Sequence, residues 1–192
     1  MTNATYADIL RPRARHLAWI YDLSLVLGGS LLVALSAQFA LRLPFSPVPI
    51  TGQTLAVLLV GALLGSARGG ISMLLYLAEG IAGLPVFAAG GAGVAYFLGP
   101  TGGYLLGFVA GATLTGLLAE RGWDRRIVTT LLAMLAGMGA IYAAGVSWLA
   151  WFANVENALA LGLYPFLPGA AVKIIAAALL LPLGWKALNF RR

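Results

Sequence analysis

The sequence predicts an all-α integral membrane protein, a bundle of six transmembrane helices with both termini in the cytoplasm. Three observations lead to this fold class. Of the 192 residues, 61% are hydrophobic and only 9% are charged, whereas a soluble domain is about 45–50% apolar and about 25% charged. The apolar residues form long runs, and most basic residues gather in short clusters between these runs. We expect one membrane domain over residues 1–192.

The first predicted helix covers residues 17–41 and follows residues 1–16, which we expect to be a cytoplasmic lead-in rather than a cleavable leader. Two shorter apolar runs, 52–66 and 70–84, lie on either side of "GSARGG", where the glycines indicate a tight turn. At 1.5 Å per residue, each run is about 22 Å long. We therefore expect a hairpin whose outer ends stop below the membrane surface.

The long uncharged stretch that follows exceeds one helix and breaks at the glycine-rich "FAAGGAGVAYFLGPTGG". We expect the fourth helix at residues 101–119, the fifth at 127–152 and the sixth at 168–186. The sixth begins at Pro168, because proline favours the first turn of a helix.

The basic residues predict the orientation of the bundle. With six crossings both termini lie on one side, and cytoplasmic loops carry the excess of Lys and Arg. Arg42 falls in the loops of the opposite side, and Lys173 lies inside the sixth helix. The other ten basic residues lie on the side of the termini: Arg11, Arg13, Arg15, Arg68, Arg121, Arg125, Arg126, Lys186, Arg191 and Arg192. This side is therefore expected to be cytoplasmic.

Three segments on the outer side are rich in glycine, proline, amide and aromatic residues: "SPVPITGQTL", "GLPVFAAGGAGVAYFLGPTGG" and "FANVENALALGLYPFLPG". Irregular backbone at membrane depth is tolerated where protein buries it or where it lines a cavity. We expect these segments to form a pocket open to the outside. The alternative is that they are ordinary surface loops.

Lys173 is the most informative single residue, because a lysine inside a membrane helix costs about 2.5–3.5 kcal/mol. One interpretation is an anion site; the other is that its stem extends to the outer headgroups. Thr51, Gln53 and Thr54 offer neutral hydrogen-bonding groups near the mouth of the second helix. Gln53 either contacts a ligand or satisfies backbone groups of the loop.

Aromatic residues in the outer half can supply the apolar wall of such a pocket, or they can belong to the interfacial aromatic belt. The candidates are Tyr96, Tyr104, Phe87, Trp148 and Trp151.

Small residues recur at four-residue spacing and predict close helix packing. The fourth helix contains Gly99, Gly103, Gly107 and Gly111, and the second contains Gly61, Gly65 and Gly69. The first helix has a small face with Ser30 and Ala34, and we expect another membrane protein to dock on an exposed face of this kind.

Enzyme activity is not expected. No GxxxxGK[ST], HExxH, GxSxG or GxGxxG motif occurs in the sequence. Cysteine is absent, which removes thiolate chemistry, and the acidic residues are scattered over different segments. No metal or cofactor is expected, and an energy-dependent function would need a separate ATPase.

Four motifs carry a resemblance to a known family: "PVPITGQTLAVLLVGALLG", "YLAEGIAGLPVFA", "LGPTGGYLLGF" and "FLPGAAVK". Over residues 44–173 the sequence closely resembles the BioY family, the biotin-specific substrate-binding component of energy-coupling-factor (ECF) transporters. The resemblance implies six helices in the bacterial cell membrane and an external biotin pocket. It also implies a transmembrane coupling subunit and two ATP-binding subunits as partners.

The resemblance implies that Lys173 binds the biotin carboxylate, while polar and aromatic groups of the outer segments hold the rest of the ligand. The expected ligand-binding residues are Lys173, Gln53, Thr51, Gly52, Tyr104, Phe87 and Asn157. One departure concerns the last motif, for which the family pattern is Pro-Gly-Asp-x-x-Lys, whereas this sequence has Ala170 in place of the acid. Asn154, Glu156 or Asn157 would have to replace that carboxylate.

Two other functions fit the same residues. One is a self-sufficient carrier or channel for biotin or another small amphiphilic acid, and the other is a structural assembly factor without a ligand. The isolated lysine offers no evident proton or sodium relay, which favours the binding component.

Overall fold

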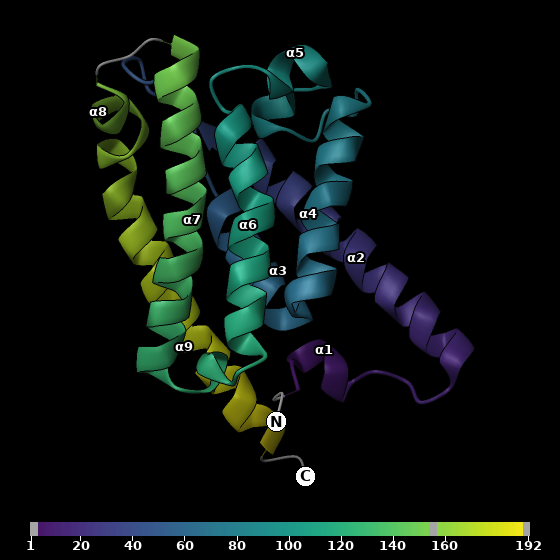
Figure 1. Ribbon diagram of the computed structural model, residues 1–192. Helices are drawn as coiled ribbons and strands as arrows, with labels where there is room; N and C mark the ends of the chain where they lie inside the picture. The colour runs from purple at the N-terminus through teal and green to yellow at the C-terminus, as the bar shows by residue number, and fades with distance from the viewer. Residues whose placement is uncertain (1–3, 154–156, 190–192) are drawn as a thin grey trace.

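The computed structural model describes residues 4–153 and 157–189, and within them six helices of twelve residues or more form a bundle (Figure 1). These are α2 (Arg15–Gln38), α3 (Gln53–Leu64), α4 (Ser66–Ile81), α6 (Gly102–Ala119), α7 (Ile127–Ala153) and α9 (Leu167–Asn189). Short helices connect them: α1 (Tyr6–Ile9), α5 (Gly93–Phe97), α8 (Ala158–Gly162) and the 3-10 turns η1 (Ala88–Gly90), η2 (Trp123–Arg125) and η3 (Tyr164–Phe166). The expected all-helical architecture is confirmed.

The first of the three polar segments lies in a small hairpin before α3. Its strands are β1 (Ala40–Leu41) and β2 (Ile50–Thr51), which pair antiparallel with Ala40 opposite Thr51. This pairing holds the end of α2 beside the start of α3. The loop is therefore fixed against the bundle.

Four helical stretches are long and apolar enough to cross a membrane: α2, α6, α7 and the region Ala158–Leu188, which contains most of α9. By contrast α3, with 12 residues, and α4, with 16 residues, are about 18 Å and 24 Å long at 1.5 Å per residue. The pair is shorter than the hydrocarbon core of about 30 Å.

The turn between α3 and α4 is tighter than the sequence predicts. Gly65 alone makes it, with a φ of +88° that favours glycine, and the helix resumes at Ser66. The carboxylate of Glu120 accepts hydrogen bonds from the Ser66 backbone N–H (2.7 Å) and hydroxyl (2.8 Å). Because an acid at a helix N-terminus stabilises it, α4 starts four residues before the predicted segment.

The predicted glycine groove is confirmed for Gly103, Gly107 and Gly111, which lie in α6 and face α7, whereas Gly99 precedes the helix and lies outside the groove. A Cβ on Gly107 would come within 2.9 Å of the Ile141 carbonyl oxygen, and one on Gly111 within 2.7 Å of the Ile141 side chain. The three glycines predicted on the second helix do not share one helix, because Gly65 forms the turn and Gly69 lies in α4. On α3, Gly61 lies against the backbone of Ala112 in α6 and against Gly69. Glycine thus lets the backbones of α3, α4, α6 and α7 approach closely.

The small face of α2 that contains Ser30 and Ala34 is used inside the protein, so it is not the exposed docking face that the sequence predicts. Ser30 is fully buried and Ala34 is 7% exposed. The Ser30 hydroxyl donates to Glu79 Oε2 of α4 at 2.5 Å. The exposed face of α2 carries large side chains, including Leu27, Leu31 and Leu35. Small residues at these positions let α4 pack closely against α2.

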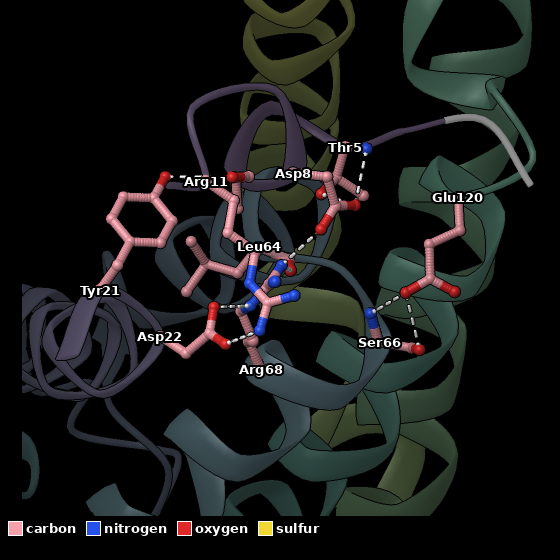
Figure 2. A network of polar contacts seen from close by, with 10 residues as sticks. Thr5, Asp8, Arg11, Tyr21, Asp22, Leu64, Ser66, Arg68 and Glu120 are labelled. Carbon is pink, nitrogen blue, oxygen red and sulfur yellow. Dashed lines mark hydrogen bonds and ion pairs between the residues drawn. The ribbon is translucent and has the colours of Figure 1, made fainter. Parts of the chain in front are cut away.

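The N-terminal stretch predicted as a tail contains α1, which lies at the same end of the bundle as the C-terminal end of α9 (Figure 1). The Tyr6 hydroxyl donates to the Leu181 carbonyl of α9 at 2.5 Å. Arg68 of α4 forms ion pairs with Asp8 and Asp22, each at 2.8 Å (Figure 2). One arginine therefore ties α1, α2 and α4 together. Arg191 and Arg192, which contribute to the predicted charge asymmetry, lie outside the described residues.

Candidate functional site

A small, largely apolar cavity lies among the first polar loop, the start of α3 and helices α6, α7 and α9. It is formed by segments far apart in the sequence, among them α5, which contributes Tyr96 and lies at the end of the bundle opposite to α1 (Figure 1). Its wall consists of Val48, Pro49, Ile50, Thr51, Gln53, Thr54, Ala88, Tyr96, Thr101, Tyr104, Leu105, Phe108, Tyr142, Pro165, Phe166, Gly169 and Lys173. A largely apolar cavity with a few polar groups has the character of a small-molecule site.

Lys173 brings a positive charge into this wall from α9. Its Nζ donates to the Thr51 carbonyl oxygen at 2.5 Å and to the Thr54 hydroxyl at 3.0 Å. An ammonium has three N–H donors, so these two neutral acceptors leave one donor for another partner. Within residues 4–153 and 157–189, no carboxylate lies within ion-pairing distance of Nζ.

The side chain of Lys173 is half-buried and reaches toward the loop before α3. The interpretation in which its stem extends to the outer headgroups is therefore wrong, because its ammonium is held inside the protein. A half-buried ammonium without a counterion attracts an anion, since a charge removed from water is stabilised by a paired charge. The cavity has the chemistry of a site for a small acid.

Gln53 lies in the cavity wall, but its polar atoms are engaged within the protein. It is 4% exposed. Its Nε2 donates to the Tyr76 hydroxyl at 2.7 Å, and its Oε1 accepts from the Thr51 hydroxyl at 3.1 Å. Tyr76 in turn donates to the Val86 carbonyl at 3.1 Å. Gln53 thus connects the first polar loop to α4 and to the segment that follows it.

The apolar wall is aromatic on the side of α6. Tyr104 and Phe108 are one turn apart on this helix, and both line the cavity. The Tyr104 hydroxyl donates to the Gly162 carbonyl of α8 at 2.7 Å. This bond holds the ring against the end of α8 in the last polar segment.

Phe87 lies behind the wall rather than in it. The residue is fully buried, and its ring stacks on that of Tyr96 with a centroid distance of 5.2 Å. It also meets the Tyr76 ring edge to face at 5.6 Å. Phe87 therefore supports two rings near the cavity.

Other sequence candidates fall outside the lining of this cavity. Gly52 is the N-cap of α3, where its carbonyl accepts from the backbone of Leu55 at 3.1 Å. Asn157 is exposed at the start of α8. Trp148 and Trp151 instead line a separate apolar hollow on the outer surface of α6 and α7.

Ala170 is buried in the core beside the site and is not part of the cavity lining. Asn154 and Glu156, which the sequence offers as substitutes for the acid expected at this position, lie outside the described residues.

Tyr142 and Phe108 are cavity residues that sequence reasoning missed. Tyr142 is the one phenol in α7, a mostly apolar helix, and this was the available signal. Phe108 follows Tyr104 by four residues, so the two occupy the same face of α6. Neither of these two signals identifies a cavity until the helices are placed together.

Taken together, the helical membrane fold and a cavity whose lysine has no carboxylate partner among the described residues define a membrane-embedded protein of the small-molecule-binding class. The chain belongs to the BioY family, whose sequence pattern it matches over residues 7–190. The family consists of transporter components, and the chain is not an enzyme.

Relatives in two bacteria illustrate this membership. The chain is 39% identical over 162 residues to the biotin transporter BioY of Rhizobium etli, which covers 80% of this chain and 87% of that protein. It is 38% identical over 141 residues to the biotin transporter BioY of Thermotoga maritima, covering 73% of this chain and 82% of that protein.

The fold also resembles a crystal structure of the S-component for biotin from an ECF-type ABC transporter. The TM-score is 0.78 at 25% sequence identity, and the match covers 91% of this chain and 95% of the other. The chain is therefore a multi-pass membrane protein of the transporter class that the sequence predicts.

Proposed function

We propose that this protein captures biotin from the outer side of the cell membrane and serves as the substrate-binding component of an ECF-type transporter. The observation that carries the proposal is the Lys173 ammonium, which two neutral acceptors hold at the cavity wall with one N–H donor remaining. Membership of the BioY family supports biotin as the acid. Biotin combines a carboxylate with an apolar bicycle and a neutral ureido group, and the wall offers partners for each.

In this proposal Lys173 binds the carboxylate, and the rings of Tyr104 and Phe108 pack against the apolar part. Thr51 contributes by its carbonyl oxygen, which holds the ammonium in place. Gln53 fixes the loop that carries Thr51. Both termini face the cytoplasm, as the distribution of Lys and Arg indicates.

Transport requires partners in this proposal, namely a transmembrane coupling subunit and two ATP-binding subunits. The chain has no phosphate-binding loop motif of its own. Uptake of labelled biotin into vesicles distinguishes this proposal from a self-sufficient carrier. We expect no accumulation with the isolated chain and ATP-dependent accumulation once the complete module is present, and accumulation by the chain alone would favour the carrier.

The carboxylate role is tested by Lys173→Met, which keeps the length of the side chain and removes its charge. A charge-assisted hydrogen bond contributes about 1.5–3 kcal/mol, so biotin affinity should fall about tenfold to a hundredfold. Affinity for biotin amide, which lacks the negative charge, should fall much less. Isothermal titration calorimetry of purified protein measures both.

Lys186→Met provides the matched control. It makes the same replacement in the last turn of the same helix, where the side chain is exposed. This variant should bind biotin like the wild type. Equal losses for biotin and biotin amide in Lys173→Met would refute the carboxylate role.

A further inference from the structure

The polar groups around the cavity are mostly engaged with other parts of the protein. Gln53 uses its amide on Tyr76 and Thr51. Tyr104 uses its hydroxyl on the Gly162 carbonyl. Lys173 retains a single N–H donor, which the proposed function assigns to a carboxylate. A ligand with a second polar group therefore needs another partner.

Tyr142 offers such a partner. It lines the cavity from α7, and among the described residues its hydroxyl has no hydrogen-bond partner. Its ring meets the ring of Tyr104 edge to face, with centroids 6.5 Å apart and planes at 86°. Since Tyr104 is anchored by its own hydroxyl, the Tyr142 ring has a fixed neighbour on one side.

A phenol removed from water is costly unless it forms a hydrogen bond. No described residue forms a hydrogen bond with the hydroxyl of the half-buried Tyr142. If the protein needed only the ring at this position, phenylalanine would serve equally well. Its hydroxyl can both donate and accept a hydrogen bond. It therefore suits a neutral polar group, whereas an ionised group is better matched by Lys173.

We propose that Tyr142 is a specificity-determining residue whose hydroxyl hydrogen-bonds the neutral polar end of the ligand. This inference rests on the proposed function, under which that end is the ureido group and the phenol donates to the ureido oxygen. Tyr142 thereby supplies a polar contact in a chain where Ala170 cannot. This contact comes from α7, and as a donor to the ureido oxygen it differs from the acceptor role that an ionised acid at position 170 would have.

The test compares biotin with iminobiotin, in which an imino group replaces the ureido oxygen. At neutral pH this group is protonated and cannot accept a hydrogen bond. Calorimetry with the wild type should show a preference for biotin. In Tyr142→Phe, the affinity for biotin should fall roughly threefold to tenfold, while the affinity for iminobiotin should fall less or rise. The preference for biotin should therefore shrink.

Two tyrosines serve as controls. Tyr164→Phe removes a hydroxyl from an exposed ring outside the cavity, and it should leave both affinities unchanged. Tyr104→Phe removes a hydroxyl that bonds to the protein backbone, so any loss should be equal for the two ligands. Thermal unfolding of each variant identifies losses that come from misfolding. If Tyr142→Phe does not fold, Tyr142→Leu gives the same ratio test without a hydroxyl.

The outcomes separate the two proposals. If the wild type binds no biotin, the proposed function fails. If the wild type binds biotin and the folded Tyr142 variants keep the wild-type preference over iminobiotin, the role of Tyr142 is wrong and the proposed function stands.

Discussion

Gln53 shows how a polar residue of a membrane protein contributes at the scale of single side chains. The sequence left two roles open for it, ligand contact or satisfaction of the loop. Its amide joins Thr51 of the outer loop to Tyr76 of α4 at distances of 3.1 Å and 2.7 Å. The Thr51 carbonyl also accepts a hydrogen bond from the Lys173 ammonium. Gln53 therefore stabilises the site indirectly, through its hydrogen bond with Thr51.

Gln53→Ala should therefore lower stability and biotin affinity together. Removing a buried partner costs about 1–3 kcal/mol, and the midpoint of thermal unfolding in detergent should fall accordingly. Gln38→Ala is the control, because this exposed amide donates only to the carbonyls of Ala34 and Pro85 at 3.0 Å and 3.4 Å. A Gln53 variant as stable as the Gln38 variant would contradict this role.

The place of a single residue in the site could be predicted from the sequence where its chemistry is unusual for its surroundings. Lys173 is conspicuous because a charge inside an apolar helix needs a reason. Phe87 and Tyr142 are ordinary aromatic residues in the sequence. Only packing decides that Phe87 lies behind the cavity wall and that Tyr142 lies in it.

At the scale of elements, four-residue glycine spacing correctly predicted where helices approach most closely. It did not identify the neighbour, which for α6 is α7 as well as α3 and α4. The start of α4 was harder to predict, because its cap is the side chain of Glu120 from the end of α6. A cap contributed from 54 residues away leaves no local signal.

Gly107 and Gly139 give a test of the groove in which the two expected effects have opposite signs. In Gly107→Ala, the new Cβ would lie 2.9 Å from the Ile141 carbonyl oxygen and 3.0 Å from its Cα. Backbone cannot move aside cheaply, so we expect a loss of about 1–3 kcal/mol. In Gly139→Ala, the new Cβ meets nothing within 4 Å, and replacing a helical glycine should stabilise by about 0.5–1 kcal/mol.

Thermal unfolding followed by circular dichroism measures both glycine variants. The unfolding midpoint of Gly107→Ala should lie below that of the wild type and that of Gly139→Ala above it. Two unchanged midpoints would mean that α6 and α7 are less closely packed than the distances indicate.

At the scale of the whole molecule, ion pairs at one end of the bundle join segments that the sequence separates widely. Figure 2 shows Arg68 between Asp8 of α1 and Asp22 of α2. Burial alone would raise the pKa of Asp8, but the hydrogen bonds from Arg68 and Thr5 outweigh it and hold the pKa below its ordinary value. The charged form of Asp8 is thus favoured in the folded protein.

This shift predicts the sign of a pH effect. A carboxyl with a depressed pKa contributes stability above its unfolded pKa of 3.8, and loses it as the pH falls through the lower folded value. Asp8→Asn should therefore lower the unfolding midpoint at pH 6, by an amount corresponding to about 1 kcal/mol or less for a partly exposed pair. The difference from the wild type should shrink toward pH 3.

Asp124 provides an internal comparison. Burial raises its pKa, and the hydrogen bond from the Trp185 ring nitrogen at 2.6 Å only partly offsets this effect. Its contribution therefore decreases as the pH rises through its folded pKa, which is opposite to Asp8. If the effects of Asp8→Asn and Asp124→Asn changed with pH in the same direction, the assignment of the two shifts would be wrong.

The sequence by itself determined the class of protein, the approximate positions of six helices, the family and the lysine that lines the cavity. Those features follow from the composition, from the lengths of the apolar runs and from short motifs. All of these depend on residues that are close together in the chain. Only the tertiary structure decided that Gln53 supports the site through Tyr76, that the small face of α2 is covered by α4, and that Tyr142 joins the cavity wall. Those features depend on which atoms meet across helices, and the apolar pattern that makes each helix insert into a membrane is the same whichever neighbour it packs against.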